Sequence, residues 1–173
     1  MAETNPGLEP WMRGTYPEVP AVLRAVLHAL ELAEEDIARW CASLTDEEWN
    51  LRPQGLPSVA FHVLHIARST GRLLTYAEGG QLSPEQLNSM RAEAAAHPTG
   101  AEVRAELNAS LTQAAQRVRS FAGQDLEAAR GLGRKQLPTS VGGLLVHVAE
   151  HAARHAGQAV TTAKLVMSAR GEF

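Results

Sequence analysis

The stretch LLVHVAEHAARHAGQ, residues 144–158, carries His147, His151 and His155 at a strict spacing of four. Residues four apart on an α-helix lie one turn above another on the same face, so neighbouring imidazoles can point at one object. Apolar residues recur beside the histidines at helical spacing. The stretch therefore predicts a long amphipathic helix whose histidines bind a metal ion.

One ion cannot bind all three of these histidines. Successive imidazoles in such a run rise about 6 Å along the helix axis, whereas metal–nitrogen bonds measure about 2.0–2.1 Å. At about 100° per residue, His155 lies nearest the apolar face and His147 nearest solvent. The preferred pair is therefore His151 with His155, and His147 is an accessory residue whose participation stays an alternative.

A third ligand is expected from the segment FHVLH, residues 61–65, which offers His62 and His65 on another predicted helix. The helical wheel places His62 nearer the apolar face, so both histidines are candidates at this point. Three neutral imidazoles suit zinc, nickel, copper or iron(II) and suit calcium or magnesium poorly. An open position on such a metal would act as a Lewis acid.

A simpler interpretation competes with the metal site. Lone histidines on a helix border are usually satisfied or solvated side chains, and this is the expectation for His28, His97 and His147. The HxxxH spacing is common, and histidine-rich helices also form pH-sensitive interfaces. Cys41 is expected to be a packed small side chain rather than a nucleophile.

Further polar side chains accompany the two histidine segments. The face of His62 and His65 also presents, on it or beside it, Arg68, Ser69, Arg72 and Tyr76. These groups could bind an anionic substrate or a metal-bound water, although surface charge is the simpler interpretation for the arginines. On the last helix, Gln158 lies on the histidine stripe and could orient a ligand, whereas Glu150 points away and is expected to be solvated.

Start and stop signals predict helices nearly throughout the chain. The predicted long helices are 17–44, 58–78, 99–122 and 139–168, with a short helix at 83–96 between the second and third of them. Capping patterns begin at Thr15, Thr45, Ser83 and Thr99. The glycine-rich segment 123–138 is expected to be irregular, with at most a helical turn at 125–130, and no strand is expected. The predicted fold is an all-α four-helix bundle with long connections.

Length and composition bound the remaining possibilities. The chain of 173 residues suits a single domain, 1–173, that starts with an irregular leader at 1–14. A net charge of -3 offers no basic field, so neither nucleic acid nor a membrane is an expected partner. A single cysteine excludes an intrachain disulfide framework. With no signal peptide or long apolar run visible, a cytoplasmic protein with a small-molecule partner is expected.

Two segments carry a family resemblance: PSVAFHVLHIARSTGRLLTYAEG at 57–79 and LLVHVAEHAARHAGQAVTTAKL at 144–165. Together with the helix order they resemble the DinB-like superfamily of four-helix-bundle metalloproteins, which includes bacillithiol- and mycothiol-dependent transferases. In such proteins one histidine of the second helix and an HxxxH pair of the last helix bind a divalent metal, often nickel or zinc. The resemblance implies His65, His151 and His155 as metal ligands, with Gln158 completing the HxxxHxGQ pattern.

The resemblance also implies an activity, a metal-dependent transferase that joins a low-molecular-weight thiol to a small electrophile. A homodimer is expected from the habit of the family. Two alternatives stay open, namely a metal-dependent hydrolase and a non-catalytic, metal-binding stress-response dimer.

Overall fold

The computed structural model of the protein describes residues 7–171, apart from the side chain of Ala94. This part holds six α-helices and one two-stranded sheet, with 68% of the chain in helices, so the prediction of a mostly helical chain is confirmed. The predicted leader begins outside the described residues. Its described part contains a 3-10 turn at Pro10–Met12.

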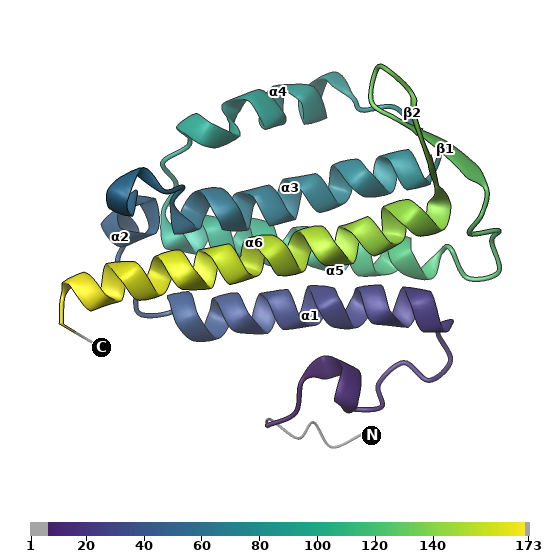
Figure 1. Ribbon diagram of the computed structural model, residues 1–173. Helices are drawn as coiled ribbons and strands as arrows, with labels where there is room; N and C mark the ends of the chain where they lie inside the picture. The colour runs from purple at the N-terminus through teal and green to yellow at the C-terminus, as the bar shows by residue number, and fades with distance from the viewer. Residues whose placement is uncertain (1–6, 172–173) are drawn as a thin grey trace.

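Four long helices lie side by side (Figure 1). They are α1 (Ala21–Cys41), α3 (Val59–Ala77), α5 (Gly100–Arg119) and α6 (Val141–Ala169). Helix α6 packs against α1 and α3, and α5 packs against the same two helices. Small residues on the buried face of α6, among them Ala152, Ala156 and Ala159, allow its close approach to both neighbours.

Contacts between the helices define their directions. Thr162 of α6 reaches the carbonyl before α3, at Pro57, and Ser69 near the middle of α3 contacts His151, so α3 and α6 are antiparallel. Arg68 pairs with Glu106, and Arg117 pairs with Glu78 beyond the end of α3, so α3 and α5 run in the same direction. The chain must therefore return along the outside before α5 begins.

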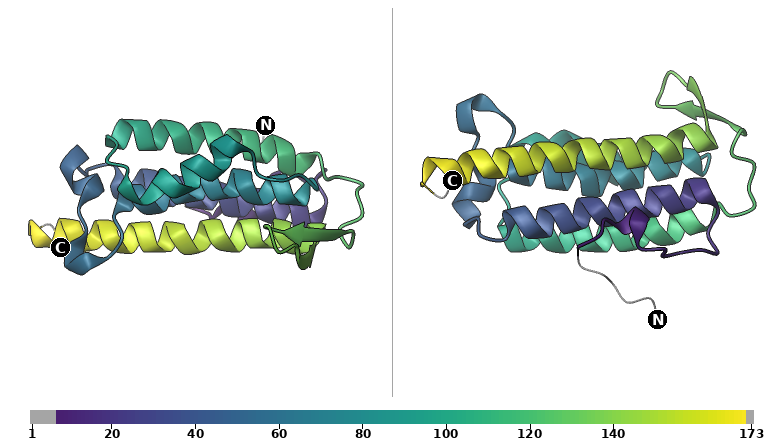
Figure 2. Two further views of the ribbon diagram at one scale, coloured as in Figure 1. Left: turned by 90° about the horizontal axis from the view of Figure 1, so that it is seen from above. Right: turned by 60° about the horizontal axis from the view of Figure 1, so that its bottom comes forward.

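The return is made by α4 (Pro84–Ala92) and a 3-10 turn at Glu93–Ala95. Figure 2 shows α4 lying over α3, between α5 and α6. A glycine makes the preceding turn possible, because Gly79 has a φ of 84° and its amide closes on Tyr76 while the next amide closes on Thr75. The short helix predicted at 83–96 is therefore present, with its last turn tightened.

Helix starts follow the predicted capping residues in most places. Capping boxes at Thr45, Ser83 and Thr99 open α2 (Asp46–Asn50), α4 and α5. The cap expected at Thr15 is wrong, because α1 begins only after Pro20 and Tyr16 has a φ of 58°. The Thr15 hydroxyl instead lies 2.9 Å from Nε2 of buried His28. The Thr15 hydroxyl therefore forms a hydrogen bond to a buried imidazole instead of capping a helix.

The prediction that the chain contains no strand is also wrong. Strands β1 (Ala129–Leu132) and β2 (Leu137–Ser140) form an antiparallel hairpin inside the segment expected to be irregular, and just before it a single hydrogen-bonded turn forms at 125–128 rather than a helix. Each strand has only four residues, and Gly131 faces Pro138, so no alternating pattern is visible in the sequence. Arg130 ties the hairpin to the end of α3 by donating to the Ala77 carbonyl at 2.7 Å.

The hairpin stands at the end of the molecule where α6 begins (Figure 1). Its loop, residues 133–136, reaches the same side of α3 that α4 covers, since both contribute to one cavity. None of the helices between residues 7 and 171 is both long and apolar enough to cross a membrane.

Candidate metal centre

His65, His151 and His155, here called the histidine triad, come together between α3 and α6. The sequence folds this way because each helix turns its histidines toward the other along the edge of the apolar core. The ring centroids lie 4.9 Å apart for His65 and His151, 4.6 Å for His65 and His155, and 4.6 Å for His151 and His155. One nitrogen from each ring lies within 4.8 Å of the other two, so the triad could hold a metal ion.

The spacing of these nitrogens is larger than the spacing around one bound transition metal. Three nitrogens bound to one tetrahedral ion at about 2.0–2.1 Å lie about 3.4 Å from one another. The triad nitrogens, which lie up to 4.8 Å apart, must therefore draw together on metal binding, and rotation of the half-buried rings about their χ angles moves them in this way.

Hydrogen bonding also fits metal binding, because Nδ1 of every triad ring is engaged. The three contacts are His65 to Glu93 Oε2 at 2.8 Å, His151 to Ser69 Oγ at 3.1 Å, and His155 to His62 Nδ1 at 3.1 Å. The nitrogen left in each ring is Nε2. A metal-binding histidine typically donates its other N–H to a neighbouring acceptor, which fixes the ring and its tautomer.

The electrostatics keep the imidazoles neutral, as metal ligands must be. Burial lowers the pKa of His151 to about 4, helped by the nearby rings of His65 and His147. Burial likewise lowers the pKa of His155 to about 4, with His151 and His65 contributing. The cluster would be strongly self-repelling if protonated. At neutral pH both rings therefore present lone pairs.

Glu93 is the functional residue that the sequence analysis missed. Its buried carboxylate accepts from His65 and, at 2.9 Å and 3.4 Å, from the two terminal nitrogens of Arg72. Burial alone would raise the pKa of Glu93, but the hydrogen bonds and charges of these partners lower it below its usual value. The simpler interpretation of Arg72 as a surface charge is wrong, since its side chain is buried. No local pattern links Glu93, in the 3-10 turn after α4, to a histidine 28 positions earlier.

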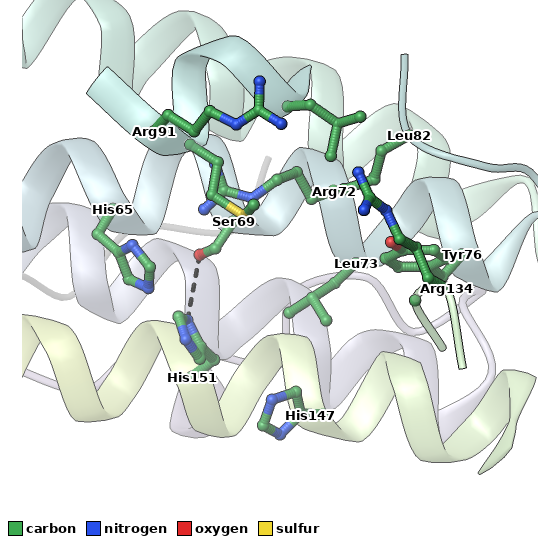
Figure 3. A pocket seen from close by; sticks show the side chains of 13 residues that line it. His65, Ser69, Arg72, Leu73, Tyr76, Leu82, Arg91, Arg134, His147 and His151 are labelled. Carbon is green, nitrogen blue, oxygen red and sulfur yellow. Dashed lines mark hydrogen bonds between the residues drawn. The ribbon is translucent and has the colours of Figure 1, made fainter. Parts of the chain in front are cut away.

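The triad borders a cavity of about 460 Å³, here called the α4 pocket, which α3, α4, α6 and the hairpin loop enclose. Figure 3 shows His65, Ser69 and His151 grouped together, with Arg134 beside Tyr76 and Leu82 at the other end. The walls combine apolar side chains with arginines. The arrangement can therefore place a small molecule against two of the three triad histidines.

His62 and His147 flank the triad. His62 is buried, contacts His155, and has its pKa lowered to about 4 by burial and by the charge of His65. His147 lines the α4 pocket and lies 3.6 Å from Glu150. Neither belongs to the group of mutually close nitrogens. The structure thus brings together the preferred set of three rather than a set in which His62 replaces His65 or His147 joins.

Other residues singled out from the sequence lie away from the triad. Gln158 is exposed and lines a separate cavity beside His62, and within the described part of the chain no hydrogen bond joins it to a triad ring. Arg68 pairs with Glu106 across the α3–α5 contact. Cys41 is buried, and burial raises the pKa of its thiol to about 12, as expected of a packed side chain.

Fold and site together define a helical protein with a three-histidine cluster that could hold a metal. Residues 29–159 match the DinB superfamily, and the chain belongs to this family. The matched range starts within α1, ends within α6 and contains the whole triad. Proteins of this superfamily are metalloproteins, which agrees with the donor set. No curated protein matches the chain.

Proposed function

We propose that this protein binds one divalent transition metal, nickel or zinc, through His65, His151 and His155. We further propose that the bound metal serves a transferase that joins a low-molecular-weight thiol to a small electrophile. The single observation that carries the metal site is the engagement of Nδ1 in all three rings, by Glu93, by Ser69 and by His62. A chance cluster of histidines has no reason to leave the same nitrogen free in each ring.

The α4 pocket favours a catalytic role over a purely structural metal. Structural zinc sites are closed by four protein ligands, whereas catalytic sites keep a position for water or substrate. Here the described cluster offers three nitrogens, and two of its rings also line a cavity. A substrate in the cavity would therefore meet the open side of the site.

A metal in this position would supply Lewis acidity that lowers the pKa of a thiol in the pocket. The protein's own side chains would do the rest. Glu93 and Ser69 hold the triad rings in one tautomer, and apolar walls exclude water from the reacting atoms. His147 lines the pocket outside the triad, so its imidazole is able to accept the thiol proton. The thiol sulfur then bonds to the electrophilic carbon, and the leaving group departs with its electron pair.

Metal uptake is the first test. Untagged, metal-free protein is titrated with zinc or nickel by calorimetry, and bound metal is counted by mass spectrometry. We expect one ion per chain, no tight uptake by His151→Ala and normal uptake by His147→Ala, the matched control on the same stripe. Absence of stoichiometric metal would overturn the proposal, as would unchanged uptake by His151→Ala.

A second test separates the transferase from a structural metal. The visible absorption of cobalt(II)-substituted protein is recorded while a thiol is added. A spectral change supports a site open to thiol, and an unaltered spectrum refutes the transferase. If the reaction occurs, His147→Ala should retain metal and lose transfer rate, because its role is proton transfer.

The finer features implied by the family belong to the same proposal. We propose that the four long helices form a four-helix bundle within a single domain, 1–173, that functions as a cytoplasmic homodimer. Parallel α3 and α5, connected by α4, support a bundle with a long crossover. Light scattering measures the oligomeric state, and a monomer at micromolar concentration would refute the dimer.

A further inference from the structure

The α4 pocket carries an uneven distribution of charge. Three arginines line it, and no aspartate or glutamate of residues 7–171 does. The charge of Arg72 is balanced by Glu93. Arg91 and Arg134, by contrast, are exposed and have no carboxylate within ion-pair distance among the described residues; Arg91 donates a hydrogen bond to Asn88 Oδ1 at 3.4 Å. The pocket therefore has two uncompensated positive charges.

The remaining wall is apolar. Leu73 and Tyr76 from α3 face Leu82, Leu87 and Met90 from the α4 segment. Met90 is 45% exposed, so its side chain is accessible to a molecule in the cavity. A cavity of about 460 Å³ lies within the range that takes small organic ligands.

The two features come from different elements. Arg91 projects from α4, whereas Arg134 belongs to the loop of the β1–β2 hairpin, and Figure 3 shows both with the apolar side chains. A cleft with walls of low dielectric focuses the field of its charges, so an anion entering it is attracted more strongly than on an open surface.

We infer that the α4 pocket binds a small organic anion with an apolar body, and that Arg134 and Arg91 hold the anionic group. The apolar body lies against Leu82, Leu87 and Met90, which leaves its other end toward His65 and His151. This inference names the substrate class of the proposed transferase and rests on that function for its biological sense. It does not need the metal for its test, because the arginines are present in metal-free protein.

Calorimetry with three probes of equal chain length tests the inference on metal-free protein. We expect octanoate to bind, octan-1-ol to bind roughly tenfold more weakly, and octylammonium not to bind, since hydrogen bonds to a charged group are stronger than those to a neutral one. Raising the salt concentration should weaken the binding of octanoate and leave the affinity for octan-1-ol unchanged. Equal affinity for octanoate and octan-1-ol would overturn the inference.

Variants provide the matched controls. Arg134→Gln should weaken the binding of octanoate about 5- to 20-fold. Lys135→Gln should leave the affinity for octanoate unchanged, because Lys135 is an adjacent exposed cation that does not line the pocket. Leu87→Asn should weaken octanoate and octan-1-ol alike. Equal losses in Arg134→Gln and Lys135→Gln would mean general attraction and refute the site. Metal uptake without octanoate binding refutes this inference alone, and octanoate binding without metal uptake refutes the proposed function alone.

Discussion

Replacing Glu93 by glutamine should destabilise the metal-free protein by about 2–4 kcal/mol. Removing one member of a buried ion pair typically costs about 3–5 kcal/mol, because the other charge is left without a partner. Glutamine keeps the volume and one acceptor of the glutamate but turns an amide N–H₂ toward Arg72 or His65, both of which are held as donors in the native structure. The expected loss is therefore large but below that of a full truncation.

The control is an ion pair of the same types on the surface. Glu106 pairs with Arg68 at 2.6 Å, but its side chain is 38% exposed. Glu106→Gln should cost less than about 1 kcal/mol, as exposed pairs usually do. Urea unfolding followed by circular dichroism in the presence of a chelator measures both variants. For Glu93→Gln the midpoint should fall by about 1–2 M.

The pH dependence of the stability difference between wild type and Glu93→Gln gives an independent check. The pKa of Glu93 is lower in the folded protein than its ordinary value. A carboxyl of this kind stabilises the protein fully above its unfolded pKa, near about 4.3, and the stabilisation is lost as the pH falls through the lower folded value. The gap between wild type and Glu93→Gln should therefore be full at pH 7 and shrink only in acid. A loss no larger than that of Glu106→Gln at pH 7 would refute the reasoning.

Three further outcomes follow from buried groups. The unfolding free energy of metal-free protein should fall as the pH is lowered from about 6.5 toward 4. The reason is that His62, His151 and His155, whose pKa values are lowered to about 4, take up protons in this window only on unfolding. An unfolding free energy that does not change between these pH values would contradict this prediction. Gly100→Ala should lower the free energy of unfolding by about 1–3 kcal/mol, since a methyl group there meets the buried indole of Trp49. Gly157→Ala, which places its methyl group in open space on α6, should leave the free energy of unfolding unchanged or raise it by up to about 1 kcal/mol. Thermal unfolding compares the two variants. The thiol of Cys41 should react with iodoacetamide orders of magnitude more slowly in native than in unfolded protein, as mass spectrometry would show, because burial raises its pKa to about 12.

The helical pattern and part of the site were accessible from the sequence because they depend on local periodicity. A spacing of four puts His151 and His155 on one face of any helix, and caps such as Ser83 and Thr99 act within three residues. The same local logic failed at Thr15, where a residue 13 positions away competes for the hydroxyl. It could not choose between His62 and His65, since both point toward α6 and only the resemblance favoured one of them.

The sequence by itself thus determined a mostly helical chain and an HxxxH pair on its last helix, because these follow from the pitch of a helix. Only the tertiary structure decided what surrounds that pair. Packing of α3 against α6 brings His65 to within 4.8 Å of the pair, and the return of the chain through α4 delivers Glu93 to Nδ1 of the same ring. The hairpin places Arg134 in the wall of the α4 pocket, although no residue pattern near Arg134 in the sequence indicates a binding site. Contacts across long stretches of chain depend on how whole elements pack, and no local period encodes that.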